Sequence, residues 1–414
     1  MNIEIAFLFI LSMILIWQFF GYPIFTGFIA LRNKPKIKDY TYKPFVSILI
    51  PTFNEEKLIE NRIKNLKSLN YPKDQFEVLI VDSASTDRTV EVIKEIQRKN
   101  EFSDLNIKII REDERRGKGS AINFGKKYAH GDIILVTDAN TIFTNNVLHE
   151  MMPHFKDPKV GGVGGRLSTA NTENKTAASA AFYWDLENMM RIGEAALDSA
   201  CFFQGEVNAW RKDLVDADPD MIAEDLHMSI KIRQKNYKIE YEPNAIVYEP
   251  SPTNISDQIT QKKRTCIGTI TAIFQSWKYF IFTRNLYTSF ILPSHKLLAV
   301  ISPFILISIL IPYFFIRDIP IIFIHIISMT LISIFLYIVL SSLLLNFKVI
   351  EKASNFSVRR TSNFSFHSIF NIIFYVLLTE YLILLAWKDL TLGKYSKLWE
   401  KVESTRTISD IESQ

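Results

Sequence analysis

Acidic and polar side chains follow three short apolar segments in the first third of the chain. These segments end in Pro51-Thr-Phe-Asn-Glu55, Asp82-Ser-Ala-Ser-Thr-Asp87 and Asp138-Ala-Asn140. Carboxylate oxygens suit a divalent cation that in turn holds phosphate oxygens. The glycine-rich loops GxGxxG and GxxxxGK[ST] are absent from the sequence, which argues against a standard dinucleotide site or P-loop. The pattern therefore favours a phosphate-containing ligand held through a cation.

The elements that must position these side chains are predicted from apolar patterning. Apolar segments of strand length alternate with segments of helical spacing, and they cover 46–50, 58–69, 76–81, 89–96, 107–110, 121–128 and 133–136. Such alternation predicts an α/β domain with a parallel sheet. The strands are apolar along their whole length, which is typical of a sheet covered on both faces. Ligands of open parallel sheets bind at the carboxyl ends of the strands, so we expect the polar segments to meet there.

Composition excludes several classes of protein. The chain has 414 residues, of which 48% are hydrophobic and 22% charged, so it is not a disordered chain. Its net charge of +4 is too small to indicate nucleic-acid binding by bulk electrostatics. The only cysteines are Cys201 and Cys266, which are too few for a disulfide framework or a cysteine-based zinc site.

Four long apolar segments predict a membrane protein. They are Ile5–Leu31, Leu297–Ile316, Pro320–Leu345 and Ile369–Trp387, each long enough to cross a bilayer. Basic residues follow the first span, which predicts that the segment after it is cytoplasmic. Four alternating spans would place the basic C-terminal tail outside, against the same rule, so its side stays open.

A mixed segment, Ile270–Leu292, interleaves aromatic and basic side chains among apolar ones. This favours a helix at the membrane surface, with a helix packed on the domain as the alternative. We therefore expect five parts. They are a span and basic linker (1–41), a cytoplasmic domain (42–265), interfacial helices (266–296), three spans (297–387) and a tail (388–414).

The motifs along the chain resemble those of family 2 glycosyltransferases. In order they are Val46-Ser-Ile-Leu-Ile-Pro-Thr-Phe-Asn-Glu-Glu56, Val81-Asp-Ser-Ala-Ser-Thr-Asp87, Arg116-Gly-Lys-Gly119, Thr137-Asp-Ala-Asn140, Ala223-Glu-Asp225 and Gln261-Lys-Lys-Arg264. The chain looks most like membrane-bound synthases of β-linked polysaccharides, such as poly-N-acetylglucosamine, chitin-oligosaccharide, hyaluronan and cellulose synthases. The resemblance implies a GT-A-type, Rossmann-like domain with transmembrane helices at both ends, at the cell membrane.

The resemblance also implies roles for individual residues. Asp225 is the expected base for the acceptor hydroxyl, and Glu224 its neighbour that positions it. Nucleotide-sugar binding is expected from Pro51, Thr52, Asn54, Glu55, Asp82, Ser83, Lys118, Asp138, Gln261 and Arg264. Mg²⁺ or Mn²⁺ is expected at Asp138 and Asn140, and the acceptor at Trp184, Gly205 and Trp210. Either tryptophan has core packing as its alternative.

Two positions depart from the family pattern. Asn140 stands where a second metal-binding acid is usual, and Thr265 stands where the processive members have tryptophan after Gln261-Lys-Lys-Arg264.

The resemblance as a whole implies transfer from a nucleotide sugar, such as a UDP-sugar, to a glycan, with a β-linked polysaccharide as product. Single addition to a lipid carrier or lipid-linked oligosaccharide is the alternative that Thr265 favours. A catalytically silent binding partner is a third hypothesis, which the intact carboxylates oppose. Membrane lipid is an expected partner, and nucleic acid is not.

Overall fold

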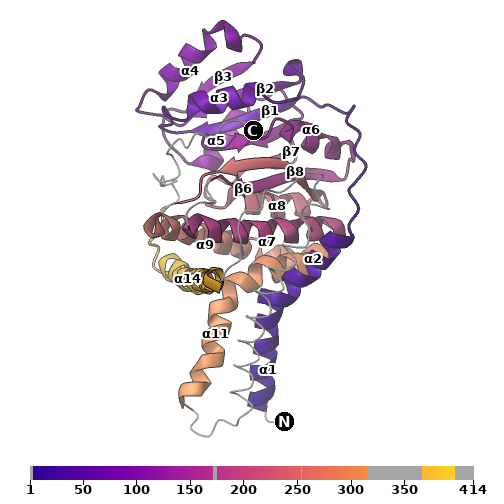
Figure 1. Ribbon diagram of the computed structural model, residues 1–414, viewed down its shortest axis with the longest axis vertical. Coiled ribbons are helices and arrows are strands. Elements are labelled where there is room, and N and C mark those ends of the chain that lie inside the picture. Colours follow the sequence, from indigo (N-terminus) through magenta and orange to yellow (C-terminus); the bar gives the residue numbers. More distant parts are fainter. Residues whose placement is uncertain (1–2, 171–174, 253, 316–365, 397–414) are drawn as a thin grey trace.

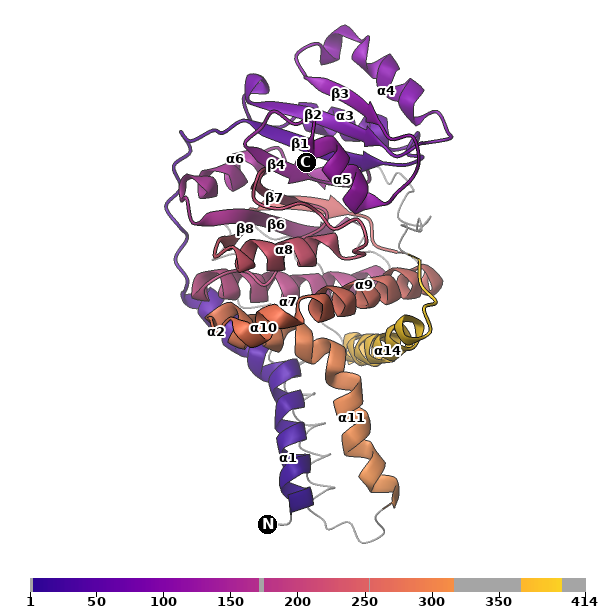
Figure 2. The ribbon, with the colours of Figure 1, turned by 180° about the vertical axis from the view of Figure 1, so that it is seen from behind.

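The computed structural model describes residues 3–170, 175–252, 254–315 and 366–396. An α/β domain forms the upper part, and the helices α1 (Ile3–Ile16) and α11 (Leu298–Phe315) project together from its base (Figure 1). From behind, helices α7, α9 and α10 lie between the sheet and these projecting helices (Figure 2). The domain therefore has a helical layer between its sheet and the apolar helices.

The first half of the sheet agrees with the predicted pattern. Its strands are parallel, in the order β3 (Ile107–Arg111), β2 (Phe76–Asp82), β1 (Val46–Thr52) and β4 (Ile133–Val136). The connecting helices are α3 (Ile59–Lys67), α4 (Thr89–Gln97) and α5 (Lys118–Lys126). Every residue of β2 and β4 is buried, because helices cover both faces of this half. The four strands and three helices are thus confirmed.

The second half of the sheet is mixed, so the prediction of a parallel sheet is wrong there. The order continues from β4 through β7 (Asn208–Arg211), β6 (Val160–Thr169), β8 (Lys238–Glu249) and β5 (Ile142–Phe143). β7 runs antiparallel to both β4 and β6, and β5 antiparallel to β8, whereas β6 and β8 are parallel. Apolar patterning shows where a strand forms but carries little information on the direction of its neighbour.

Helices form the base of the domain. They are α7 (Lys175–Leu197), α8 (Glu224–Gln234), α9 (Ile255–Gln275) and the short α10 (Trp277–Phe282). A further short helix, α6 (Val147–Met151), packs against β8. Helix α9 is continuous through residues 265 and 266. The predicted boundary between the catalytic domain and the interfacial helices therefore falls inside one helix.

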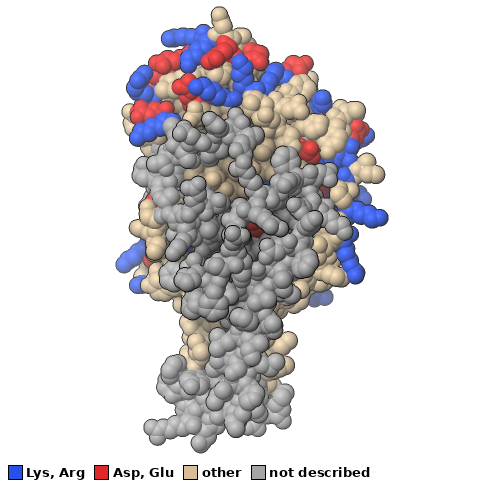
Figure 3. All heavy atoms as spheres, in the orientation of Figure 1, with Lys and Arg blue, Asp and Glu red and all other residues tan. Residues whose placement is uncertain are grey.

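Two helices in the described residues are long and apolar enough to cross a membrane. The first, Ala6–Arg32, joins α1 to α2 (Tyr22–Arg32) through a π-turn, and the second covers Tyr287–Ile311. The second begins at Tyr287 instead of the predicted Leu297. Figure 3 shows charged side chains over the upper domain, whereas the described part of the projecting helices is uncharged on this face. Length, composition and surface character of these helices agree with spans.

The described part of the structure does not show the other two predicted spans as membrane-crossing helices parallel to the first two. Residues 320–345 lie outside the described residues. Residues 369–387 belong to α14 (Phe366–Thr391), which contacts α9 and is seen nearly end-on in Figures 1 and 2. It therefore runs across the direction of α1 and α11, and its membrane crossing stays a prediction.

Close packing joins the first apolar helix to the domain. Gly193 of α7 faces the backbone of Thr26 in α2, and a Cβ at residue 193 would lie 2.1 Å from the Thr26 carbonyl oxygen. Backbone atoms cannot move aside as a flexible side chain can. The contact of α2 with α7 therefore requires glycine at this position.

Substitution of Gly193 by alanine tests this contact. We expect Gly193→Ala to destabilise the protein by about 2 kcal/mol, since the added methyl overpacks a rigid interface. Thermal unfolding in detergent measures the change. Ala196→Ser, at an exposed position of the same helix, is the control and should leave the unfolding temperature unchanged. An unchanged temperature for Gly193→Ala would show that the two helices can separate without cost.

Candidate active site

A cleft opens where β1, β2 and β4 end, and it has two connected parts. The first cavity is lined by Pro51, Thr52, Phe53, Glu55, Ser83, Arg115, Gly117, Lys118, Asp138, Ala139 and Asn140. The second shares Lys118, Asp138 and Asn140 with the first and is the more extensively lined of the two. It extends between α7, α8 and α9 towards the base of the domain. The cleft therefore joins the sheet edge to the region where the apolar helices begin.

A buried ammonium group holds the centre of the cleft together. Lys118 Nζ lies 2.8 Å from Asp138 Oδ1 and 3.2 Å from Glu224 Oε1. It also donates to the Gly205 carbonyl at 3.3 Å. Burial alone would lower the pKa of Lys118, but the carboxylates of Asp138 and Glu224 raise it above its usual value. The side chain thus stays charged and links α5, the end of β4 and the start of α8.

Asp225 has the properties of a general base. It lies in the first turn of α8, lines the second cavity, and accepts a hydrogen bond from the Leu226 N–H at 2.8 Å. Burial, and then the charge of Glu224, raise the pKa of Asp225 to about 7. A carboxylate that titrates near neutral pH is well matched to accept a proton from a hydroxyl group.

Two further acids in the cleft were not predicted. Glu206 and Glu249 both line the second cavity. Burial raises the pKa of each, and the charge of Asp138 adds to this. Asn140 donates to Glu249 Oε1 at 3.0 Å. The position of Glu206 beside Gly205 was a usable signal, whereas Glu249 reaches the site only because β8 ends there.

This group of acids fits a divalent cation. Hard cations prefer oxygen ligands, and Asp138, Asn140 and Glu249 all line the second cavity, where Asn140 contacts Glu249. The buried Glu206 Oε2 also has no hydrogen-bond partner among the described residues. A cation here would satisfy buried oxygens that protein donors leave unsatisfied.

Six of the ten residues predicted for the nucleotide sugar line the first cavity, two line only the second cavity, and Asn54 and Asp82 line neither. Pro51, Thr52, Glu55 and Ser83 are brought together there. Asn54 instead joins two loops, since its Oδ1 accepts from the Thr86 N–H at 2.7 Å.

Asp82 is fully buried, and its Oδ2 lies 3.2 Å from Arg111 Nε. It is not part of the lining, and its expected role in nucleotide-sugar binding stays a prediction. Arg115 and Phe53 line the cavity instead and were not predicted; the guanidinium lies 4.1 Å from the ring centre. The paired cation and ring offer a flat surface next to Thr52.

The acceptor-side predictions are divided. Trp184 and Gly205, both predicted for the acceptor, line the second cavity. Gln261 and Arg264, which were predicted for the nucleotide sugar, also line it, together with Thr265. Trp210 does not, so its prediction as an acceptor residue is wrong.

Trp210 is fully buried in β7, where it pairs with Ile134 and stacks on Phe203. It lies in the middle of a central strand, and its ring is enclosed by the hydrophobic core. Packing in the core was the alternative interpretation of this residue, and the structure supports it.

Comparison with known proteins gives consistent results. The models of Glycosyl transferase family 2 and Glycosyl transferase family group 2 match residues 47–217 and 133–388. A probable glycosyltransferase of Bacillus subtilis is 31% identical over 266 residues, covering 59% of this chain and 62% of that protein. Poly-beta-1,6-N-acetyl-D-glucosamine synthase of Staphylococcus aureus is 29% identical, covering 58% of each. The chain thus matches about three fifths of the length of these relatives.

A solved structure shares the fold. The mannosyltransferase PcManGT of Pyrobaculum calidifontis, in complex with GDP-Man and Mn²⁺, superposes with a TM-score of 0.64 at 24% identity. The similarity covers 84% of this chain and 97% of that one. At this level of identity the likeness concerns the fold alone.

Removal of the central ammonium group tests the electrostatics of the cleft. We expect Lys118→Met to destabilise the protein by about 3–5 kcal/mol, because it leaves buried carboxylates without their cation. Thermal unfolding with a chelator measures the loss, and added Mn²⁺ should restore part of it.

Lys64→Met, which removes an exposed pair with Glu60, is the matched control and should have little effect. If both variants unfold at the same temperature, or Mn²⁺ does not stabilise Lys118→Met, the electrostatic account of this site is wrong.

Proposed function

The chain belongs to glycosyl transferase family 2, with a GT-A-like α/β fold and a mixed sheet, and from this premise we propose its reaction. It transfers a sugar from a nucleotide sugar, a UDP-sugar such as UDP-N-acetylglucosamine or UDP-glucose, to an acceptor hydroxyl with inversion. One observation carries this proposal: Asp225, with its pKa near 7, shares a cleft with Asp138 and Lys118. A base for the acceptor and a site for the diphosphate thus lie together.

The donor is proposed to occupy the first cavity and its junction with the second. Thr52 and Ser83 would contact the nucleoside, and Phe53 with Arg115 would flank it. Lys118 would face the diphosphate, together with Arg264, whose planar guanidinium suits phosphate oxygens.

The cation is proposed to be Mg²⁺ or Mn²⁺. Asp138 would hold it, with Asn140 and Glu249 beside it. When bound, it neutralises the charge of the departing diphosphate.

Asp225 performs the proton transfer in the proposed reaction. Its carboxylate accepts the proton of the acceptor hydroxyl, whose oxygen forms a bond to the anomeric carbon. The bond from that carbon to the diphosphate breaks, and the nucleoside diphosphate leaves with the electron pair. Attack from the opposite face converts an α-linked donor into a β-linked product. Glu224 keeps the pKa of Asp225 high, which makes the carboxylate a better proton acceptor.

We propose a β-linked polysaccharide as the product, because the second cavity has aromatic side chains in its wall. Tyr183 and Trp184 line it, and aromatic faces suit the apolar faces of sugar rings. The name of the Staphylococcus aureus relative agrees with such a product.

Single addition to a lipid carrier or lipid-linked oligosaccharide is the second candidate. It is favoured by Thr265, which lines the cavity with a small side chain. The size distribution of the products separates the two, since only a polymerase gives a ladder.

A multi-pass location at the cell membrane, with the catalytic domain in the cytoplasm, is also part of the proposal. Ala6–Arg32 and Tyr287–Ile311 are suited to spans and leave the same base of the domain (Figure 1). Lys34, Lys36 and Lys38 follow the first of them, as expected on the cytoplasmic side.

Release of UDP from protein in membranes tests the activity. With a panel of UDP-sugars and Mn²⁺ or Mg²⁺, we expect release with one sugar and loss of release with a chelator. Asp225→Asn should lower the rate about 10³-fold, because the base is removed. Asp74→Asn, at an exposed position, should match the wild type. No release with UDP-, GDP- or dTDP-sugars in the presence of lipid extracts would refute the proposal.

The pH dependence of the rate tests the base. Asp225 must be deprotonated to act, so kcat/KM should fall about tenfold per pH unit below pH 7 and level off above it. Glu224→Gln removes a charge that raises the pKa of Asp225, so the break should move to lower pH in that variant. The opposite shift, or a rate that does not depend on pH between 5 and 8, would exclude Asp225 as the base.

A further inference from the structure

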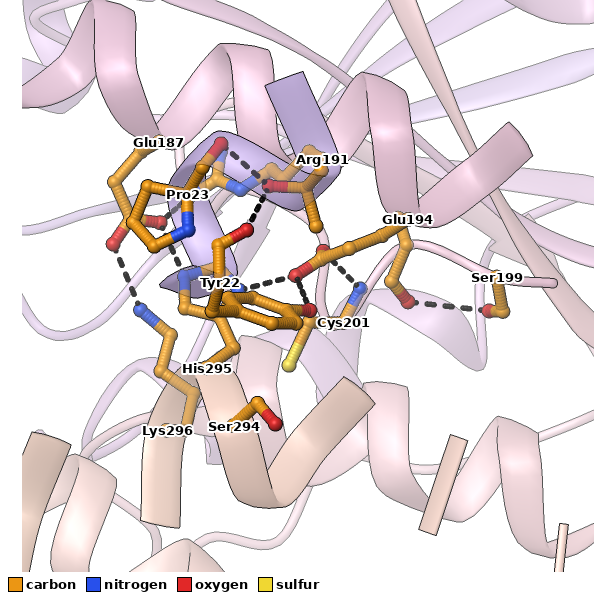
Figure 4. A network of polar contacts seen from close by, with 12 residues as sticks. Tyr22, Pro23, Glu187, Arg191, Glu194, Ser199, Cys201, Ser294, His295 and Lys296 are labelled. Carbon is orange, nitrogen blue, oxygen red and sulfur yellow. Dashed lines mark hydrogen bonds and ion pairs between the residues drawn. The ribbon is translucent and has the colours of Figure 1, made fainter. Parts of the chain in front are cut away.

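The segment Ser294-His295-Lys296 has no part in the proposed reaction. It lies in a π-turn (Pro293–Leu297) at the start of the second apolar helix. Such turns often occur where a helix serves a function. Ser294 and His295 are buried, and Lys296 reaches the second cavity as one of its lining residues. Figure 4 shows the three side chains beside α7 and the first apolar helix.

Glu187 of α7 has contacts with its own helix and with the turn that contains His295 and Lys296. Its carboxylate accepts hydrogen bonds from Lys296 at 3.1 Å, Tyr183 at 2.7 Å and Arg191 at 3.2 Å. His295 Nε2 lies 3.1 Å from it (Figure 4). Burial alone would raise the pKa of Glu187, but Lys296, His295 and Arg191 hold it well below its usual range. Glu187 is therefore a permanent negative charge that several donors share.

Glu194, nearly two turns further along α7, joins the first apolar helix to the same group. It accepts from the Tyr22 hydroxyl at 2.6 Å and from the Cys201 N–H at 2.9 Å, and His295 Nδ1 lies 2.6 Å away (Figure 4). Trp17 Nε1 also donates to Ser294 Oγ at 3.0 Å. Both apolar helices are thus fixed to α7 through buried polar contacts.

The same contacts fix the wall of the second cavity. Phe202 contacts two cations, with the Arg191 guanidinium 4.2 Å and Lys296 Nζ 4.3 Å from its ring centre. Arg191 also donates to Gln204. Phe202, Gln204, Tyr183 and Lys296 all line the cavity. A change at Lys296 would therefore alter the positions of both Phe202 and Tyr183 in this wall.

We propose that Lys296, supported by His295 and Glu187, is a positioning residue that holds Tyr183 and Phe202 in the wall that receives the acceptor. The proposal rests on the proposed transferase function and adds that the second apolar helix supplies part of the acceptor site. The donor end of the cleft has none of these contacts, since its lining comes from the ends of β1, β2 and β4 and the start of α5. Donor cleavage by water should then depend little on Lys296, whereas transfer to an acceptor should depend on it strongly.

The ratio of transfer to hydrolysis tests this inference. The full chain in membranes is given the radiolabelled UDP-sugar that the wild type uses, and both incorporated sugar and total UDP are measured. We expect Lys296→Met to lower the ratio of transfer to hydrolysis at least tenfold, while hydrolysis stays within twofold of the wild type. Lys296→Arg retains the charge beside Glu187 and should restore most of the ratio.

Two further variants keep the test decisive. Tyr183→Phe removes only the hydroxyl that donates to Glu187, and it should lower the same ratio about threefold without loss of folded protein. Lys156→Met removes an exposed pair with Asp39 and should change nothing.

Either of two results would overturn the inference. One is a ratio unchanged in both Lys296→Met and Tyr183→Phe. The other is an equal fall of transfer and hydrolysis, which a purely structural role would give. Wild-type protein that releases no UDP at all would instead refute the proposed function.

Discussion

The cleft depends on the interaction of one buried ammonium group with the carboxylates around it. Lys118 contacts Asp138 and Glu224, and Glu206, Asp225 and Glu249 lie in the same cavity. Buried like charges repel strongly, and each carboxylate raises the pKa of its neighbours. The ammonium pairs with Asp138 and Glu224, while burial and the charge of Glu224 raise the pKa of Asp225 to about 7. A carboxyl group with such a pKa suits the role proposed for Asp225.

The two halves of the sheet supply different parts of the cleft. Parallel strands bring the loops after β1, β2 and β4 to one edge, where they form the first cavity. The mixed half adds Glu249 at the end of β8, and the segment that leads into β7 adds Gly205 and Glu206. The proposed cation site and the proposed base therefore lie at the junction between the two halves of the sheet.

Helix α7, at the bottom of the domain, joins the wall of the second cavity to the two apolar helices. Glu187 and Glu194 lie on one helix and take donors from the first apolar helix, the second apolar helix and the wall of the cavity. Burying such a network is costly unless every member has a partner. This requirement restricts the position of the helices on the domain, and the rigid contact between Gly193 and Thr26 restricts it further. The wall of the second cavity and the helix junction thus form one packed unit.

Elements and motifs with local signals could be predicted from the amino-acid sequence. These include the four parallel strands, the polar loops that follow them, the Glu224-Asp225 pair and the two apolar helices that the structure describes. Tertiary structure alone decided the direction of β7, the burial of Trp210, the pairing of Asp82 with Arg111 and the presence of Glu249 in the cleft. Each of these depends on strands or helices that are distant in sequence but adjacent in space. Periodicity reports which face of an element is buried, but it does not report which element covers that face.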